Sequence, residues 1–210
     1  VLGHELCGEV VALGRGVSEF TVGQRVALIP YVSCQQCDAC LSGKSNCCEN
    51  ISVIGVHQDG GFCEFLSVPA SNLLAVDDVA PEAAALIEPF AISAHAVRRA
   101  AVVADEQVLV VGAGPIGLGV AAIAAAAGAQ VVVVDTSEPR RQHVSEKLGL
   151  ATINPLAEDF DAALRAEFGG RLAAKVIDAT GSPAAMNGAV KLIRHGGTIV
   201  FVGLHKGDLV

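Results

Sequence analysis

Positive charge is scarce in this sequence. Its 210 residues include 14 lysines and arginines against 22 aspartates and glutamates, which gives a formal net charge of −8. Binding to nucleic acid requires a basic face, so this balance argues against a nucleic-acid partner. The excess of acid is explained by solubility alone.

Long uninterrupted apolar segments are also missing, although 52% of the residues are hydrophobic. The nearest candidate, Leu118–Ala127, is too short to span a bilayer and is bounded by Gly117 and Gly128. We therefore expect no membrane partner. The length allows one or two domains with a sizeable core.

A secretory signal pattern is not visible either, and this absence bears on the seven cysteines. Without such a signal, the cysteines indicate reduced thiols that bind metal rather than disulfides, and we expect a cytoplasmic location. The chain starts at Val1 without a methionine, and a motif follows immediately. We expect a fragment that is truncated at both ends.

The stretch from Val108 to Asp135 is the most informative part of the sequence. Val108–Val111 and Val131–Val134 are short β-branched runs, typical of strands buried on both faces. Between them lies an alanine-rich run that predicts a helix. The turn before that helix has the G-x-G-x-x-G spacing of a dinucleotide site, with Gly112, Gly114 and Gly117.

Each residue of this stretch has a physical reason in a dinucleotide site. The glycines allow a tight turn, close approach of a pyrophosphate and close packing of helix on strand, while the helix start attracts the phosphates. Asp135 would accept hydrogen bonds from the ribose hydroxyls and repel a 2′-phosphate, which favours NAD over NADP. Arg140 and Arg141 lie near enough to accept that phosphate, so NADP remains open.

Strands and helices continue to alternate after Asp135, which predicts a doubly wound parallel α/β sheet. We expect helices at 138–148, 157–168 and up to Ile193, and strands at 152–154, 175–178 and 198–202. Ligands bind at the carboxyl ends of such strands. Further cofactor contacts are therefore expected at Ala179, Thr180, Val202 and Gly203.

Short strand-like runs separated by glycine turns predict an antiparallel β domain before residue 80. We expect strands at 9–13 and in the segment that ends at Pro30. A further hairpin is expected from Ile51 to Pro69, with Asp59-Gly60-Gly61 at its tip. Pro81–Ala101 should be helical in two pieces, broken at Glu88-Pro89.

A cysteine-rich polar loop lies within this first part. It has the pattern C-x2-C-x2-C-x7-C, formed by Cys34, Cys37, Cys40 and Cys48. Four thiolates suit tetrahedral zinc, and a loop this short depends on metal for its folding. Cys47 could replace Cys48 as the fourth ligand, and an iron–sulfur cluster is a weaker alternative because of the wide last gap.

Three other residues are candidate ligands. His4 and Glu5 taken alone would be an ordinary buried histidine and a solvated acid. Glu88 lies between apolar residues, and an acid in such a setting is paired, protonated or bound to a metal.

Together these motifs resemble the zinc-dependent medium-chain dehydrogenases, the alcohol and sorbitol dehydrogenase group. The resemblance is carried over the whole chain by Gly3-His4-Glu5, the four-cysteine loop, Asp59-Gly60-Gly61, Glu88-Pro89 and Gly112–Gly117. It implies a partial GroES-like catalytic domain at 1–88, with a structural zinc lobe. A partial Rossmann-like NAD-binding domain is implied at 89–210.

The resemblance also implies roles for individual residues. His4, Glu5 and Glu88 match the catalytic zinc site, and the four cysteines match the structural zinc site. The expected NAD-binding residues are Gly112, Gly114, Pro115, Ile116, Gly117, Asp135, Arg140, Thr180, Val202 and Gly203. The family's catalytic cysteine and proton-relay hydroxyl lie before the Gly-His-Glu motif, so we expect the fragment alone to be inactive.

The implied reaction transfers hydride from a secondary hydroxyl of a sugar acid or polyol to NAD, with zinc polarising the hydroxyl. L-Galactonate is the first substrate to expect, with L-idonate, sorbitol and threonine as neighbours, and the full-length protein should be a homo-oligomer. The alternative is a catalytically inactive NAD- and zinc-binding module that acts as a sensor or binds a partner. A thiol-redox or iron–sulfur protein is a weaker reading.

Overall fold

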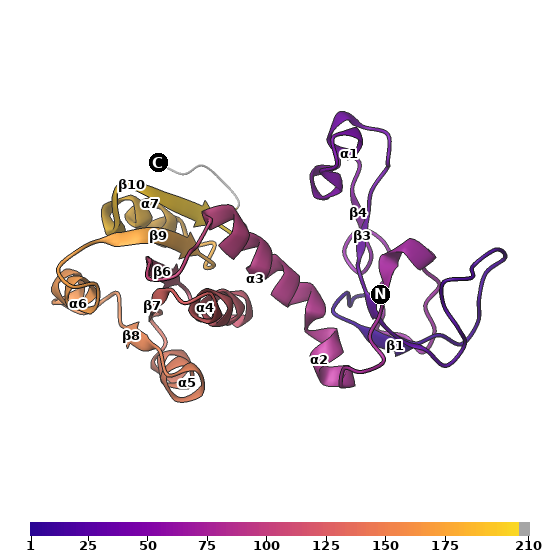
Figure 1. Ribbon diagram of the computed structural model, residues 1–210, viewed down its shortest axis with the longest axis horizontal. Coiled ribbons are helices and arrows are strands. Elements are labelled where there is room, and N and C mark those ends of the chain that lie inside the picture. The colour runs from indigo at the N-terminus through magenta and orange to yellow at the C-terminus, as the bar shows by residue number, and fades with distance from the viewer. Residues whose placement is uncertain (206–210) are drawn as a thin grey trace. The chain divides into compact units, whose positions relative to one another are not determined.

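The computed structural model describes residues 1–205 in two compact units (Figure 1). The first unit is Val1–Glu88, and the second begins at Pro89. The boundary falls inside one helix, α3, two residues after it begins.

The second unit is built on a five-stranded parallel sheet with the order β10-β9-β6-β7-β8. Its strands are β6 (Gln107–Val111), β7 (Gln130–Val134), β8 (Ala151–Ile153), β9 (Ala173–Asp178) and β10 (Ile193–Phe201). Its helices are α3 (Ile87–Ala100, from its third residue), α4 (Pro115–Ala126), α5 (Glu138–Leu148), α6 (Phe160–Glu167) and α7 (Pro183–Leu192). The predicted doubly wound α/β fold is confirmed.

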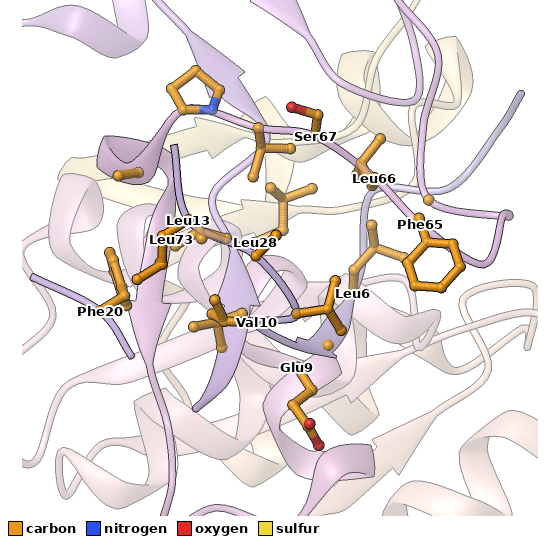
Figure 2. Close-up of a pocket in the computed structure, with 18 of the residues that line it drawn as sticks. Leu6, Glu9, Val10, Leu13, Phe20, Leu28, Phe65, Leu66, Ser67 and Leu73 are labelled. Carbon is orange, nitrogen blue, oxygen red and sulfur yellow. The ribbon is translucent and has the colours of Figure 1, made fainter. Parts of the chain in front are cut away.

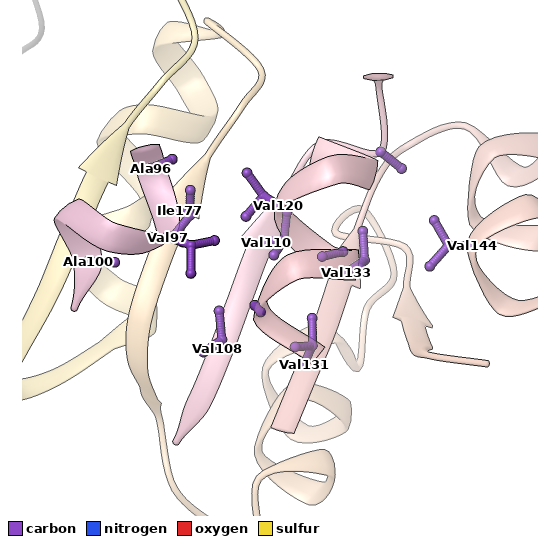
Figure 3. Packing of buried hydrophobic residues seen from close by; sticks show 13 residues of the cluster. Ala96, Val97, Ala100, Val108, Val110, Val120, Val131, Val133, Val144 and Ile177 are labelled. Atoms are coloured by element: carbon purple, nitrogen blue, oxygen red, sulfur yellow. The ribbon is translucent and has the colours of Figure 1, made fainter. Parts of the chain in front are cut away.

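Side-chain alternation along the two central strands divides the core of this sheet into two layers. Val108, Val110, Val131 and Val133 pack with residues of α3, α4 and α5 on one face (Figure 3). The intervening residues, such as Leu109 and Val132, pack with α6 and α7 on the other face. A strand that is buried on both faces has to be apolar at every position, which is why these runs are continuous.

The first unit contains two small antiparallel sheets. One has the order β1-β2-β5, with β1 (Cys7–Glu9), β2 (Arg25–Leu28) and β5 (Leu73–Ala75). The other pairs β3 (Tyr31–Val32) with β4 (Ser52–Val53). Short helical elements complete this unit: α1 (Asp38–Leu41), η1 (Ser45–Cys47), η2 (Ala70–Asn72) and α2 (Pro81–Ala85).

One predicted strand and one predicted hairpin in the first unit are wrong. The strand predicted at 9–13 lies instead at Cys7–Glu9, where these residues pair with β2. Beyond it, Val10 N–H still donates to the Gln24 carbonyl. The predicted hairpin from Ile51 to Pro69 does not form. Its first strand pairs with β3, and residues 60–62 bond to the backbone of residues 1–3. The partners come from distant sequence, which a local pattern does not reveal.

The predicted break between the two helices is also displaced. Helix α2 ends at Ala85, Leu86 forms the junction, and α3 begins at Ile87. Pro89 therefore lies in the first turn of α3, where its missing N–H would have no partner in any case. This placement puts Glu88 at the start of a helix rather than at a break. Within residues 1–205, no helix has the length and hydropathy needed to cross a membrane.

Candidate metal centres and dinucleotide-binding turn

The backbone that carries His4 is held by the loop that follows β4. Gly61 N–H donates to the carbonyl of Gly3 at 2.9 Å, and Gly3 itself has a φ of 103°, which favours glycine. A Cβ on Gly55 or Gly60 would lie 2.3 Å or 2.2 Å from that same carbonyl oxygen. The Asp59-Gly60-Gly61 motif is thus explained by close backbone approach next to His4.

His4, Glu5 and Glu88 come together in the first unit. One ligand atom from each lies within 4.8 Å of the others. Glu88 is buried, with 7% of its surface exposed, whereas Glu5 is exposed. Among the residues described, no ion pair joins His4 to either carboxylate. The three groups are therefore close enough to share one ion.

Tyr31 is the residue of this cluster that the sequence did not indicate. Its hydroxyl donates a hydrogen bond to Oε1 of Glu88. Burial and the adjacent Glu88 carboxylate raise the pKa of Tyr31, so the phenol stays protonated and able to donate. Tyr31 is the only tyrosine in the chain. That rarity, three residues before the first cysteine of the metal loop, was the one available signal.

The chemistry of this donor set fits zinc. A buried carboxylate needs a compensating charge, and within residues 1–205 no lysine or arginine pairs with Glu88. The Tyr31 hydroxyl supplies a hydrogen bond but no charge. Imidazole nitrogen and carboxylate oxygen are both zinc ligands, and three protein ligands with an open fourth position are typical of catalytic zinc.

The four-cysteine group forms the second candidate metal centre. The sulfurs of Cys34, Cys37, Cys40 and Cys48 all lie within 4.8 Å of one another. Zn–S bonds of about 2.3 Å in a tetrahedron separate the sulfurs by about 3.8 Å, a spacing that this group can reach with little or no movement. Cys47 is exposed and lies outside the group. The geometry therefore favours Cys48 as the fourth ligand.

Backbone amides prepare two of these thiols for metal binding. Gln35 has a φ of 60°, and after this left-handed residue the amides of Gln36 and Cys37 donate to Cys34. They lower the pKa of the Cys34 thiol to about 6. Amides of Cys40 and Glu49 lower the pKa of Cys37.

The other two thiols are in contrasting surroundings. Burial, followed by contact with neighbouring thiols, raises the pKa of Cys40 to about 12, so Cys40 needs a cation to become a thiolate near neutral pH. Cys48 is buried and accepts hydrogen bonds from the amides of Cys34 and Asn50, each at 3.3 Å. A bound metal ion would supply the positive charge that stabilises the Cys40 thiolate, which the neighbouring thiols do not supply.

The glycine turn of the second unit has the geometry of a phosphate site. Gly112 has a φ of 97°, and a Cβ on Gly117 would lie 1.8 Å from the Gly112 carbonyl oxygen. Gly114 is the N-cap of α4, and a Cβ there would meet nothing within 4 Å. Gly112 and Gly117 must therefore be glycine for the turn and helix α4 to pack, whether or not a ligand is bound. The space beside Gly114 is open to a ligand at the positive end of the helix.

Asp135 lies at the carboxyl end of β7 and is 9% exposed. Its Oδ2 accepts from Ala113 N–H at 2.8 Å, and its Oδ1 accepts from Ser137 N–H at 2.8 Å. Arg140 lies 3.7 Å from Oδ2, and Arg141 donates to the Asp135 backbone carbonyl. These contacts fix the carboxylate at the turn, and a carboxylate has further lone pairs for ribose hydroxyls.

The remaining predicted cofactor contacts lie on the same unit. Pro115 opens α4, and the carbonyl of Ile116 accepts from the buried Ser93 hydroxyl at 3.0 Å. Thr180 donates its hydroxyl to Asp178 at 2.9 Å. Val202 and Gly203 follow β10 and bond to the Asp178 carbonyl. Thr180 also touches the turn, because a Cβ on Gly112 would lie 2.8 Å from its methyl group.

The first unit also contains an apolar cavity of about 530 Å³. Its lining includes Leu6, Val10, Leu28 and Leu73, and Figure 2 shows the Glu9 carboxylate pointing away from these aliphatic side chains. None of His4, Glu5 and Glu88 lines it. The cavity therefore plays no part in the metal centre.

Comparison with known proteins identifies the class. The family described as "Zinc-binding dehydrogenase" matches residues 115–210, and the family described as "Alcohol dehydrogenase GroES-like domain" matches residues 1–78. The chain belongs to the zinc-dependent medium-chain dehydrogenase family, as its motifs predict.

Individual relatives narrow the comparison. The chain is 70% identical over 209 residues to an L-galactonate-5-dehydrogenase of Escherichia coli K12, a match that spans 100% of this chain and 62% of the relative. It is 34% identical over 207 residues to a sorbitol dehydrogenase of Bacillus subtilis, spanning 97% of this chain and 59% of that protein. The chain thus spans about 60% of the length of these relatives.

Solved structures agree with the fold assignment. A zinc-binding dehydrogenase of Sinorhizobium meliloti bound to NADP matches with a TM-score of 0.92 at 32% identity, over 100% of this chain and 63% of that one. An Escherichia coli CFT073 alcohol dehydrogenase complexed with NADH matches with a TM-score of 0.91 at 36% identity, over the same shares. Both forms of the nicotinamide cofactor therefore occur among proteins of this fold.

Proposed function

We propose that the full-length protein is a zinc- and NAD-dependent dehydrogenase that oxidises a secondary hydroxyl of a sugar acid or polyol. The observation that carries this proposal is the cluster of His4, Glu5 and Glu88, in a chain that also contains the acid-bearing glycine turn. In this proposal residues 1–88 belong to the catalytic domain and residues 89–210 to the NAD-binding domain.

At the catalytic centre, His4 and the two carboxylates would hold the zinc ion. When bound there, zinc would supply Lewis-acid chemistry that makes a nearby secondary hydroxyl more acidic. The chain's own contribution is to fix the ligands: the 55–62 loop holds the backbone at His4, and the start of α3 holds Glu88. Cys34, Cys37, Cys40 and Cys48 would hold a second, structural zinc.

At the cofactor site, the first turn of α4 would bind the pyrophosphate of NAD through its free amides. Asp135 would accept hydrogen bonds from the ribose hydroxyls, and its negative charge disfavours a 2′-phosphate. Arg140 lies beside that carboxylate and partly offsets its charge. We therefore propose NAD as the preferred cofactor.

L-Galactonate is the substrate that we propose to test first. The proposal rests on the 70% identity to a protein named L-galactonate-5-dehydrogenase, which extends over the whole of this chain. Two carboxylates near zinc make the site harder than one with two thiolates, which suits substrates with several oxygens. L-Idonate, sorbitol and threonine are the substrates to compare.

The test uses the full-length protein with NAD and L-galactonate. Wild-type protein should bind two zinc ions per chain and reduce NAD, while His4→Ala should lose turnover and keep NAD affinity. Turnover unchanged in His4→Ala would refute catalysis at this centre. One zinc per chain with NAD binding and no turnover would indicate the inactive binding module instead.

We further propose that the full-length protein is a cytoplasmic homo-oligomer. All seven cysteines are unpaired in the structure, which suits a reducing compartment. Cell fractionation and light scattering on the purified full-length protein test the location and the oligomeric state.

A further inference from the structure

The Glu88 carboxylate has one close protein partner. Tyr31, on β3, donates its hydroxyl hydrogen to Oε1 of Glu88, which lies 57 residues later at the start of α3. Within residues 1–205 no other side chain and no backbone amide donates to that carboxylate. The position of this candidate ligand therefore depends on Tyr31 to an unusual degree.

Tyr31 itself is held firmly through its backbone. It pairs with Val53 across the β3–β4 sheet, and the preceding carbonyl, that of Pro30, accepts from Ile54 N–H at 3.0 Å. The buried Asn72 donates its side-chain amide to the Tyr31 carbonyl at 3.2 Å. The phenol thus projects from a fixed backbone, so its hydroxyl can set where Glu88 lies.

The type of partner matters as much as its position. A lysine or arginine at this place would neutralise Glu88 and compete with a metal ion for it. A protonated phenol instead orients one carboxylate oxygen and leaves the negative charge uncompensated by protein. Metal-binding carboxylates commonly accept a hydrogen bond from a residue that does not itself bind the metal. Such a residue orients the ligand and affects the affinity for the metal.

We propose that Tyr31 is a positioning residue for the catalytic metal, acting through its hydrogen bond to Glu88. It keeps the Glu88 carboxylate within reach of His4 and Glu5, so that the three groups present one metal site. This inference rests on the proposed function, since it assumes that His4, Glu5 and Glu88 bind zinc.

The test is Tyr31→Phe in the full-length protein, which removes the hydroxyl and keeps the aromatic ring. The zinc affinity of the catalytic site, measured by chelator competition, should fall about 10- to 100-fold, as for other supporting partners of metal ligands. The thiolate zinc should be unaffected. In the Co²⁺-substituted protein, the visible bands of the catalytic site should shift, and kcat should fall more than KM rises.

Ser33→Ala is the matched control. It deletes a hydroxyl two residues along the same segment, from a side chain that bonds to Gln35 and not to Glu88. Its zinc affinity and Co²⁺ spectrum should equal those of the wild type. A fall in zinc affinity like that of Tyr31→Phe would show a general effect of the segment and overturn the proposal.

A double-mutant cycle tests whether Tyr31 acts through Glu88. Tyr31→Phe should weaken zinc binding in the wild-type background and have little further effect in Glu88→Ala. Equal effects of Tyr31→Phe in both backgrounds would overturn the inference. So would an unchanged zinc affinity in Tyr31→Phe, provided that the wild-type protein binds two zinc ions and is active. Wild-type protein that binds one zinc and lacks turnover would instead refute the proposed function.

Discussion

Gly60 has no side chain, and the space that a Cβ would need is already filled. A Cβ there would lie 2.2 Å from the Gly3 carbonyl oxygen and 2.5 Å from Cα of Gly55. Gly60→Ala should therefore displace the backbone that carries His4. We expect destabilisation by about 1–3 kcal/mol, typical of overpacking, and loss of the catalytic zinc with retention of the thiolate zinc.

Thermal unfolding and zinc analysis of the full-length protein measure both effects of Gly60→Ala. Gly14→Ala is the control within the same unit, because a Cβ there would make only an ordinary contact of 3.8 Å with Val17. It should keep both zinc ions. A Gly60→Ala protein with wild-type stability and two zinc ions would contradict this account of the motif.

The charge of Asp135 should decide the preference for NAD over NADP. Asp135→Asn keeps an acceptor oxygen but removes the charge that binds ribose hydroxyls and repels a 2′-phosphate. Charge-assisted hydrogen bonds contribute about 1.5–3 kcal/mol, so NAD affinity should fall about 10- to 100-fold while NADP affinity changes less. Calorimetric titration of both cofactors into full-length protein measures this.

Glu138→Gln controls for charge at the start of α5, since Glu138 lies in its first turn three residues beyond Asp135. It should leave the preference for NAD over NADP unchanged. If Asp135→Asn also keeps that preference, another group selects the cofactor.

Asp135 and Tyr31 also mark how far the sequence predicts individual residues. Asp135, the glycines and the strands around them lie within one continuous stretch, so spacing and β-branched runs were enough to predict their arrangement. The contact between Tyr31 and Glu88 spans 57 residues and depends on how β3 and α3 are placed. No local periodicity encodes such a contact, and the rarity of tyrosine marks Tyr31 without indicating its partner.

At the scale of elements, substitution can test whether Cys47 or Cys48 is the fourth ligand of the metal loop. The 3₁₀ helix η1 ends at Cys47, and this turn exposes Cys47 while burying Cys48. Cys48→Ser should lose the thiolate zinc, because a hydroxyl is a much poorer zinc ligand than a thiolate. Cys47→Ser should retain it. Zinc content of the two full-length variants measures the difference.

The opposite result, with zinc lost in Cys47→Ser and kept in Cys48→Ser, would mean that the turn rearranges when metal binds. Zinc kept in both variants would show that neither cysteine is required by itself, which contradicts the assignment of Cys48 as the fourth ligand. The pair is well matched, because each variant replaces one of two adjacent cysteines in the same loop by serine.

The hairpin predicted from Ile51 to Pro69 failed because its strands have distant partners. The sequence from Ile51 to Pro69 has strand-like runs on both sides of a glycine turn, which is the usual pattern of a hairpin. In the structure, Gly60–Phe62 bond instead to Val1–Gly3, and β4 pairs with β3. Turn composition predicted where the chain bends, but the partner of each strand was decided by the rest of the unit.

At the scale of the whole molecule, the two units differ in what holds them together. The main buried cluster of the second unit contains thirteen residues, whereas Ala27, Val76 and Ala84 form a small cluster in the described part of the first unit. The segment from Cys34 to Cys48 contributes no residue to any of the described buried clusters, so its stability would come from bound metal. We therefore expect zinc to stabilise the first unit selectively.

Chelation of zinc from the full-length protein, followed by hydrogen–deuterium exchange, tests this expectation. Amides of β1 to β5 should lose protection by at least tenfold, because removal of ligand that binds only the folded state lowers its stability. Amides of β6, β7 and β9 should keep theirs, since their protection comes from the valine core. Restoring zinc should restore protection in the first unit alone. Equal loss in both units would mean that they unfold as one cooperative body, and no loss in either would mean that zinc contributes nothing to folding.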